Sequence, residues 1–277
     1  MISGRTRLIA HLGYPTESFW APMIYNPWFE RKGIDAVVVP MGVRSDDYAA
    51  FLRLLLRASN IDGALVTMPH KAATAALLDE VSPAVRIAGS CNAILRREDG
   101  SLYGEMFDGE GFIRGARRKG FEFAGARCLV VGAGGVGSAI AAAIAARRPR
   151  LLAVFDIRRD AAEALVTRLS RHYPDLAVEM RDNDPAGYAL VVNATPLGMR
   201  ADDPLPFDPQ RLDPRTFVGE VVLATEMTRL LRAAEARGCR YLVGSDMLFE
   251  QIPAYLEFFG YGAASVEELR ERAQISY

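Results

Sequence analysis

Short apolar segments alternate along the chain with longer segments in which apolar residues recur at helical spacing. The short segments are rich in Val, Ile, Leu and Ala and end at Gly, Pro or polar residues, a pattern typical of strands buried on both faces. We expect strands at residues 6–12, 34–41, 64–68, 127–131, 151–155, 177–180, 189–193, 218–222 and 241–243, and helices at residues 21–32, 48–58, 71–78, 107–119, 138–148, 160–172, 228–237 and 247–259. Residues 90–95 and 102–105 predict a further strand pair. Successive strand–helix units require parallel pairing, so the pattern predicts an α/β fold.

Two prolines and one polar cluster indicate where two of these helices begin and where one is interrupted. Pro22 suits the first turn of the helix that begins near Ala21, whereas Pro27 is expected to break or bend it. Residues 45–47, Ser-Asp-Asp, are expected to cap the helix that follows them.

A glycine loop joins the strand at residues 127–131 to an Ala-rich helix. Gly132, Gly134 and Gly137 fit the pattern G-x-G-x-x-G, and Gly135 and Val136 lie between the last two glycines. The first glycine permits a tight turn, the second lets the backbone approach a pyrophosphate, and the third lets helix and strand pack closely. The helix N-terminus offers free N–H groups to the phosphates. Strand, glycines and helix in this order predict a Rossmann-type dinucleotide site.

Asp156 ends the next apolar segment, 19 residues after Gly137. An acid at this distance accepts hydrogen bonds from the adenosine ribose. A carboxylate also repels a 2′-phosphate, so we expect NAD rather than NADP. Arg158 and Arg159 are able to bind a phosphate, but we favour a solvated loop for them because Asp156 precedes them.

The composition excludes several classes of protein. The chain has 277 residues, of which half are hydrophobic, and a net charge of −1, which favours neither nucleic acid nor a membrane surface as a partner. The three cysteines are far apart, and His11, His70 and His172 are equally scattered, so we expect no disulfide and no metal site. No apolar segment approaches the ~20 residues that span a bilayer. We expect a reduced, cytoplasmic protein, monomeric or homodimeric.

The pattern predicts two domains. Residues 1–106 alternate strand and helix without a phosphate-type glycine loop, and residues 107–244 contain the glycine loop. Residues 245–277 end the chain with an amphipathic helix and a final segment, which the pattern alone assigns to neither domain.

Three polar residues are candidates for the chemistry, and two of them lie where a strand is predicted to end or a helix to begin, which is where parallel sheets place their active sites. Lys71 follows the strand at 64–68, Asn92 lies in the strand pair, and Asp108 opens the helix at 107–119. Taken alone, Lys71 is better explained as a solvated lysine, whereas Asp108 is explained equally well as a helix cap.

Several segments, in one order, resemble motifs of the shikimate/quinate dehydrogenase family. Residues 66–71 (VTMPHK) resemble its V-T-x-P-x-K, residues 89–93 (GSCNA) its G-A-x-N-T, residues 108–112 (DGEGF) its D-G-x-G-F, residues 193–199 (NATPLGM) its N-A-T-x-x-G-M, residues 244–251 (GSDMLFEQ) its G-x-x-M-L-x-x-Q, and residues 13–15 and 22–26 its opening segment. Together they extend over nearly the whole chain.

The resemblance implies the roles of particular residues. It implies a substrate domain and a Rossmann-type nucleotide domain, with the C-terminal helices returning to the first, and it implies Lys71 and Asp108 as the catalytic pair. Substrate contacts are implied for Thr67, Asn92 and Gln251, and nucleotide contacts for Asn193, Thr195, Leu197, Gly244 and Met247. The implied reaction is hydride transfer between NAD and a ring hydroxyl of a cyclic polyol.

The chain departs from the family where the family binds a substrate carboxylate. The two serines and the tyrosine that hold this carboxylate in the family are replaced by Phe19, Ala21 and Leu223, so all three hydroxyls are lost. Elsewhere, an asparagine of the family pattern is replaced by Leu65. Burial of a carboxylate without donors is costly, so we expect weak or no activity on shikimate and quinate, and a substrate whose carboxylate is missing, moved or replaced. The nearby Tyr14, Ser18, Trp20 and Tyr25 are able to supply donors from other directions, which keeps a shikimate-like acid open.

Two other functions compete with this prediction. One is an NADP-dependent biosynthetic shikimate dehydrogenase, which Asp156 disfavours. The other is a nucleotide-binding sensor without turnover, which retention of Lys71 and Asp108 disfavours because a sensor needs no proton transfer.

Overall fold

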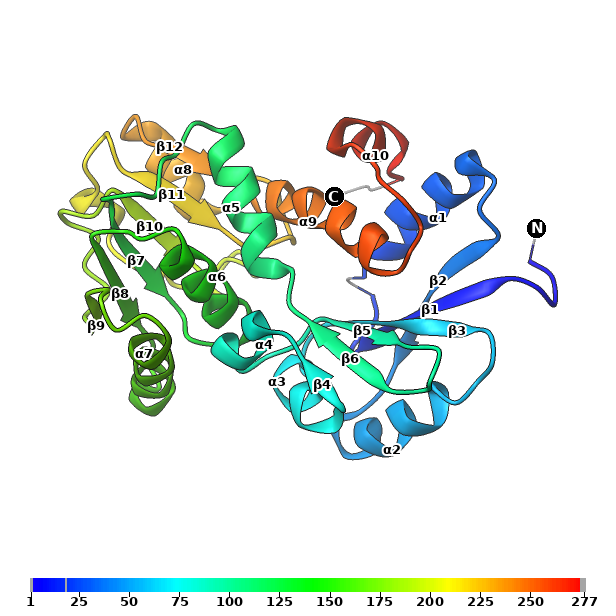
Figure 1. Ribbon diagram of the computed structural model, residues 1–277. Helices are drawn as coiled ribbons and strands as arrows, with labels where there is room; N and C mark the ends of the chain where they lie inside the picture. Colours follow the sequence, from blue (N-terminus) through cyan, green and yellow to red (C-terminus); the bar gives the residue numbers. More distant parts are fainter. Residues whose placement is uncertain (1, 18, 275–277) are drawn as a thin grey trace. The chain divides into compact units, whose positions relative to one another are not determined.

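The computed structural model describes residues 2–17 and 19–274 and divides into two compact units (Figure 1). The first unit extends to Phe107 and includes the C-terminal segment from Ile252; the second unit is Asp108–Gln251. The C-terminal segment therefore belongs with the N-terminal one. The boundary falls inside helix α9 (Gly244–Phe258) rather than before it, where residue 244 ended the expected nucleotide domain.

A mixed six-stranded sheet with the order β2-β1-β3-β5-β6-β4 organises the first unit. Its strands are β1 (Arg7–Gly13), β2 (Ala36–Gly42), β3 (Ile61–Val66), β4 (Glu80–Val81), β5 (Ala93–Arg96) and β6 (Leu102–Glu105). Strands β2, β1 and β3 are parallel, and β5 is antiparallel to both β3 and β6. The helices are α1 (Ala21–Lys32), α2 (Ser45–Leu55), α3 (Lys71–Thr74), the 3-10 turn η1 (Ala75–Leu77), α4 (Pro83–Ala88) and α10 (Val266–Arg272).

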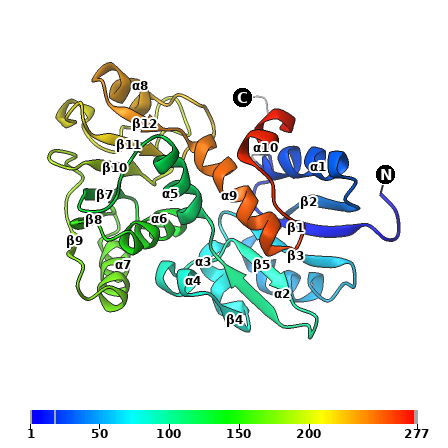
Figure 2. The same cartoon turned by 45° about the horizontal axis from the view of Figure 1, so that its top comes forward.

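The sequence predicts a break or a bend at Pro27; helix α1 continues through this residue, so the proline does not break it. Proline has no N–H, which leaves the carbonyl of Met23 without its partner within the helix. The N–H of Gln274, just after α10, donates to that carbonyl at 3.0 Å. Helices α1 and α10 lie side by side (Figure 2), and this contact from the far end of the chain compensates for the proline.

Two other boundaries differ from the sequence pattern. Helix α2 already begins at Ser45, and the extended residue before it is Arg44, so Ser45 is not the cap. Helix α4 was not predicted, although it has a conventional start: the Ser82 Oγ accepts from the N–H of Val85 at 3.2 Å. It is short enough that no helical period is visible in its sequence.

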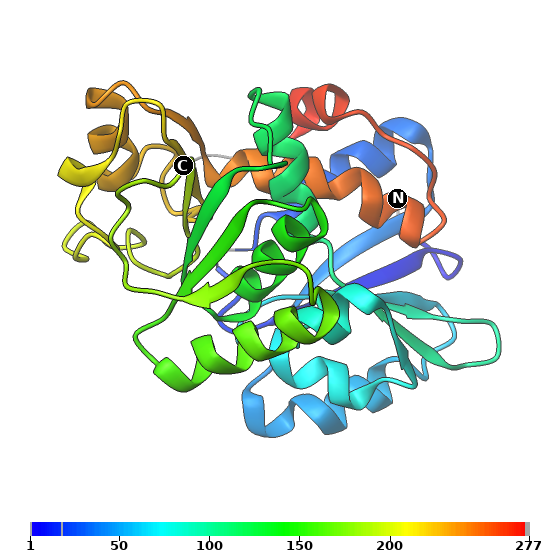
Figure 3. The same ribbon diagram turned by 60° about the vertical axis from the view of Figure 1, so that its left-hand side comes forward.

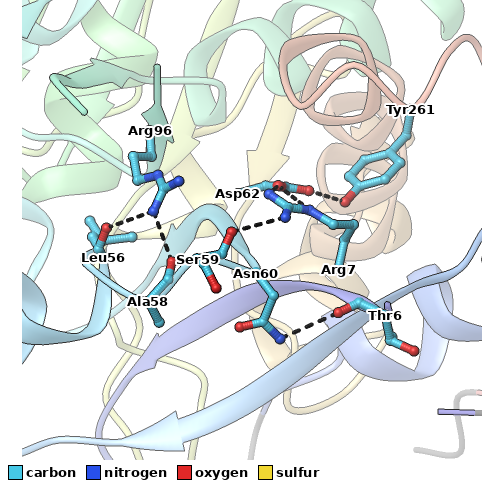
Figure 4. A network of polar contacts seen from close by, with 9 residues as sticks. All are labelled: Thr6, Arg7, Leu56, Ala58, Ser59, Asn60, Asp62, Arg96 and Tyr261. Atoms are coloured by element: carbon cyan, nitrogen blue, oxygen red, sulfur yellow. Dashed lines mark hydrogen bonds and ion pairs between the residues drawn. The ribbon is translucent and has the colours of Figure 1, made fainter. Parts of the chain in front are cut away.

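A partly buried polar network ties the C-terminal segment into the first unit (Figure 4). Arg7 on β1 donates through Nε to Asp62 on β3 at 2.7 Å, and the Tyr261 hydroxyl donates to the same carboxylate. Arg7 also donates to the carbonyl of Ser59 at 3.0 Å. Residues far apart in sequence thus meet at one carboxylate.

A fully parallel sheet with the order β12-β11-β10-β7-β8-β9 organises the second unit. Its strands are β7 (Arg127–Val131), β8 (Leu151–Phe155), β9 (Val178–Met180), β10 (Leu190–Asn193), β11 (Phe217–Glu220) and β12 (Arg240–Leu242). Its helices are α5 (Asp108–Arg118), α6 (Gly135–Ala146), α7 (Arg159–His172), the 3-10 turn η2 (Pro209–Arg211) and α8 (Arg229–Ala236), with the first part of α9. Figure 3 shows α6 and α7 beside the strands that they join.

The strand order reverses between β7 and β10. The chain runs outward through β8 and β9, returns to β10 on the other side of β7, and runs outward again through β11 and β12. Open parallel sheets bind ligands at the carboxyl ends of the strands at such a reversal. Within the described residues, no helix is both long and apolar enough to cross a bilayer.

Candidate functional site

The glycine loop after β7 is as tight as its sequence requires. Gly132 has φ +109°, a conformation that favours glycine, and a Cβ there would lie 2.8 Å from the carbonyl carbon and oxygen of Ala194. A Cβ on Gly137 would lie 1.9 Å from the carbonyl oxygen of Gly132. Both positions exclude any side chain, so the strand and the start of α6 pack backbone against backbone.

Gly134 differs from these two glycines. It has φ −71°, lies before the first residue of α6, and a Cβ there would have nothing within 4 Å. Gly135 and Val136 follow in the first turn of α6, both half-buried. A cradle with open space over Gly134 and the N–H groups of a helix N-terminus fits a pyrophosphate. The residues present therefore fit a bound dinucleotide.

The Asp156 carboxylate lies next to this loop and fixes it. Its Oδ2 accepts from the N–H of Ala133 at 2.7 Å, and its Oδ1 accepts from the N–H of Arg158 at 2.8 Å. The side chain of Arg158 stays 68% exposed, while Arg159 pairs with Glu163 at 2.8 Å. Asp156 thus has both a structural role in the loop and free lone pairs for a ribose hydroxyl.

The loop after β10 is held by its own side chains. Asn193 is fully buried; its Nδ2 donates to the carbonyl of Leu197 at 2.9 Å, and its Oδ1 accepts from the Thr195 hydroxyl at 2.6 Å. The N–H of Leu197 in turn donates to the Thr195 Oγ1 at 3.1 Å. The side chains of Asn193 and Thr195 therefore shape the loop, and its backbone is what remains for a ligand.

Glu220, at the end of β11, stabilises the same loop through a hydrogen bond from Asn193. Its Oε1 accepts from Asn193 Nδ2 at 3.0 Å and from the N–H groups of Val221 and Val222 at 3.0 and 3.3 Å, and its Oε2 accepts from the Thr228 hydroxyl at 3.1 Å. Burial raises the pKa of Glu220 to about 7, against the opposing effect of these hydrogen bonds. One carboxyl group thus joins the ends of β10 and β11 to Thr228, the cap of α8.

The remaining predicted residues of the second unit lie on α5, on α9 and after β11. Asp108 is the first residue of α5 and is buried. Gln251 is buried on α9, and its Oε1 has no hydrogen-bond partner among the described residues. Gly244 opens α9 so close to β11 that a Cβ would lie 2.2 Å from the carbonyl oxygen of Val222. Met247 on α9 is buried, and Leu223 is half-buried.

In the first unit, Thr67, Lys71 and Asn92 lie at the carboxyl end of β3 and the start of β5. The N–H of Thr67 donates to the carbonyl of Leu12 at 2.8 Å, and the N–H of Cys91 to the carbonyl of Lys71 at 2.8 Å. Asn92 is buried, and its Oδ1 accepts from the N–H of Phe107 at 2.9 Å. The first unit thus brings the predicted catalytic Lys71 and the predicted substrate contacts Thr67 and Asn92 together near the carboxyl end of β3.

Phe19 and Ala21, the apolar replacements, are buried in the same unit. A Cβ on Gly13 would lie 2.7 Å from the tip of the Phe19 ring and 2.5 Å from the Thr67 methyl group. The Phe19 ring also lies against His11, with centroids 4.2 Å apart. An aromatic ring thus occupies the space between the end of β1 and Thr67.

The alternative donors divide by exposure. Tyr14 is 45% exposed and carries Arg44 over its ring, whereas Tyr25 is buried, which raises the pKa of its phenol well above the ordinary value. Trp20 is half-buried, and Ser18 lies outside the described residues.

Two residues of these sites were not predicted from sequence: Glu220 and His11. Each is a polar residue that follows at least three residues without a polar side chain in its strand, and that interruption is the signal that was available. No group of residues in the described part of the chain has the geometry of a metal site. Cys91, Cys128 and Cys239 are free and buried.

Known proteins resemble the chain along its whole length. Residues 12–94 match the shikimate dehydrogenase substrate binding domain. The shikimate dehydrogenase (NADP(+)) of Acidiphilium cryptum is 36% identical over 263 residues, covering 94% of this chain and 93% of the relative. The shikimate 5-dehydrogenase of Listeria monocytogenes, solved with shikimate and NAD, is 26% identical with a TM-score of 0.89, covering 98% and 97% of the two chains. Quinate dehydrogenase of Corynebacterium glutamicum, solved with NAD, is 30% identical with a TM-score of 0.86, covering 96% and 98%.

These similarities confirm the predicted α/β fold of two units, with a Rossmann-type unit and returning C-terminal helices. They also confirm that the protein is an oxidoreductase of the shikimate type that acts on a CH–OH group with a nicotinamide dinucleotide. The chain belongs to the shikimate dehydrogenase family.

Proposed function

We propose that the protein transfers hydride between NAD and a ring hydroxyl of a shikimate-like cyclic polyol whose carboxylate is missing, moved or replaced by a less polar group. The observation that carries this proposal is the burial of Phe19 against Gly13, beside Thr67. A carboxylate placed against this ring would lose its hydration without gaining a donor from it, which costs several kcal/mol.

Lys71 and Asp108 are proposed as the proton-transfer residues, with Thr67, Asn92 and Gln251 as substrate contacts. In the reducing direction Lys71 protonates the oxygen of the nascent alkoxide; in the oxidising direction it accepts the hydroxyl proton. A bound nicotinamide supplies or accepts the hydride. The unpartnered Gln251 Oε1 is available to accept from a substrate hydroxyl.

Nucleotide binding is assigned to the glycine loop and the segments next to it. The pyrophosphate is proposed to bind at Gly134, Gly135 and Val136, between the two closely packed glycines 132 and 137, and the ribose at Asp156. The backbone near Asn193, Thr195 and Leu197, with Gly244 and Met247, is proposed to border the nicotinamide.

The substrate proposal is tested by comparing shikimate with methyl shikimate, in which a neutral ester replaces the carboxylate. We expect a higher kcat/KM for the ester. The double variant Phe19→Ser/Ala21→Ser should raise kcat/KM for shikimate, whereas Phe19→Ala, which makes space without a donor, should not. A kcat/KM for shikimate of ~10⁴ M⁻¹s⁻¹ or above in the wild type would refute the proposal.

The role of Lys71 is tested by two variants. Lys71→Ala should leave NAD binding intact and lower kcat by roughly 10²-fold or more. Lys71→Arg keeps the positive charge but does not release its proton, so kcat should fall comparably while KM changes less. Unchanged turnover in both variants would remove Lys71 from the mechanism.

An NADP-dependent enzyme is the competing proposal, supported by the cofactor in the names of curated relatives and by the exposed side chain of Arg158 beside Asp156. The ratio of kcat/KM for the two nucleotides decides between them. Asp156 favours NAD because its charge repels a 2′-phosphate.

A further inference from the structure

His11 is a buried polar residue that the proposed reaction does not use. It lies near the end of β1, in register with Pro40 of β2 on one side and Leu65 of β3 on the other. Its relative exposure is 8%. Neither neighbouring side chain offers it a hydrogen bond, because both are apolar.

The imidazole Nδ1 is fully buried and has no hydrogen-bond partner among the described residues. A buried polar atom without a partner costs about 1–3 kcal/mol, and folded proteins leave few of them. Because His11 Nδ1 lies near the proposed substrate residues, its missing partner indicates a ligand group that forms a hydrogen bond with it.

The surroundings of His11 lead to the proposed substrate residues. The Phe19 ring lies 4.2 Å from the imidazole, centroid to centroid, and its tip lies against Gly13 together with the Thr67 methyl group. Thr67 and Lys71 belong to the same short segment, in which the N–H of His70 donates to the carbonyl of Thr67 at 3.0 Å. His11 therefore lies within the same cluster as Thr67.

The electrostatics keep the imidazole neutral. Burial and the nearby positive charge of Lys71 together lower the pKa of His11 to about 3. A neutral imidazole brings no charge to pair with a carboxylate. It donates or accepts one hydrogen bond at Nδ1 according to its tautomer, and a hydroxyl group is complementary to either state.

We propose that His11 is a substrate-contacting, specificity-determining residue whose Nδ1 hydrogen-bonds a hydroxyl group of a neutral cyclic polyol, next to the ring hydroxyl handled by Lys71. This assignment rests on the proposed function and extends it: the side of the substrate that faces Phe19 and His11 carries a hydroxyl rather than an acid. Specificity arises because a substrate without that hydroxyl leaves Nδ1 unpaired.

The kinetic test compares His11→Leu, which removes the polar atom, with His11→Asn, whose amide lies close to the position of Nδ1. The probes are shikimate, methyl shikimate, quinate and myo-inositol, with NAD. His11→Leu should raise KM by roughly tenfold, which corresponds to the loss of one hydrogen bond, with kcat changed less. His11→Asn should recover most of the lost affinity.

The pH–rate profile from about pH 6 to 9 should keep its shape in both variants, because His11 does not titrate there. Equal kcat/KM for all three proteins on a compound that the wild type turns over would overturn the proposal.

A second measurement does not depend on turnover. In protein with ¹⁵N-labelled histidine, each probe is added in the presence of NAD, and the Nδ1 resonance of His11 is followed by NMR, with His11→Asn as the assignment control. A shift with at least one probe is expected. A shift without turnover of any probe would retain His11 as a ligand contact and contradict the proposed substrate. The absence of a shift with every probe would overturn the assignment of His11, whatever the turnover.

Discussion

The loop after β10 and the carboxyl ends of β1 and β3 differ in how their polar side chains are hydrogen-bonded. At the loop, Asn193, Thr195 and Glu220 form hydrogen bonds with one another and with the backbone. At the edge, His11 keeps a buried nitrogen without a partner among the described residues, and Phe19 fills the adjacent space. The polar groups of the first region satisfy one another, while the second region leaves one buried nitrogen that we propose a ligand completes.

The difference follows from what each region is proposed to bind. The nicotinamide and pyrophosphate groups are common to NAD and NADP, so a rigid arrangement of backbone groups that fits them costs no reorganisation when either nucleotide binds. The substrate is what distinguishes one member of the family from another. A pocket with one unpaired polar atom and an apolar wall is selective, because a ligand that lacks a hydrogen-bonding group for that atom binds more weakly.

The largest expected effect comes from breaking the nucleotide loop at its tightest point. Gly137→Ala would place a methyl group 1.9 Å from the Gly132 carbonyl oxygen, so the loop and α6 must move apart. We expect a loss of several kcal/mol in unfolding free energy and no measurable NAD binding. Gly134→Ala is the matched control, because its methyl group meets nothing within 4 Å.

For Gly134→Ala we expect unchanged stability and weaker NAD binding, since the methyl group enters the space proposed for the pyrophosphate. Chemical denaturation and calorimetric titration measure the two effects. Equal stability of Gly137→Ala and the wild type would contradict the close packing, and unchanged NAD affinity in Gly134→Ala would contradict the position of the pyrophosphate.

A smaller effect, dependent on pH, is expected from Glu220. Its pKa is raised from 4.5 in the unfolded chain to about 7 in the folded one, so its contribution to stability is fully present below pH 4.5 and is lost as pH rises through about 7. Over this interval the wild type should lose about 3 kcal/mol relative to Glu220→Gln, which keeps the oxygen acceptor but has no ionisable proton. Urea denaturation at a series of pH values measures the difference.

Glu179→Gln, a change at a half-exposed carboxylate on β9, controls for the loss of one negative charge. Parallel stability curves for the wild type and Glu220→Gln would show that the Glu220 carboxyl does not titrate in this range. The NAD affinity of Glu220→Gln should stay close to that of the protonated wild type, because the neutral amide reproduces the bonds of the acid.

The smallest effect is expected at Asp156. Asp156→Asn keeps an oxygen for the N–H of Ala133 but removes the charge that disfavours a 2′-phosphate. The ratio of kcat/KM for NAD to that for NADP should fall by about tenfold, which corresponds to about 1.4 kcal/mol. Steady-state kinetics with both nucleotides measure the ratio. A wild type that already prefers NADP would remove the basis of this prediction.

Features written in contiguous residues could be predicted from the sequence. The glycine loop, the strand before it and the acid after it form a local pattern whose constraints are steric: Gly132 has a positive φ, and Gly137 has no room for a Cβ. The same holds for the apolar strands of the second unit, because strands covered on both faces must be apolar throughout. The departures at Phe19 and Ala21 were also visible, because they interrupt a contiguous family motif.

Only the tertiary structure decided the features that join distant residues. Pro27 is tolerated inside α1 because Gln274 donates to the carbonyl that the proline leaves free. Glu220 contacts the loop after β10, and His11 lies between β2 and β3, because strand register and loop packing place them there. A single polar residue in an apolar strand shows that something must satisfy it, but the partner is set by chain segments tens of residues away, which no local pattern encodes.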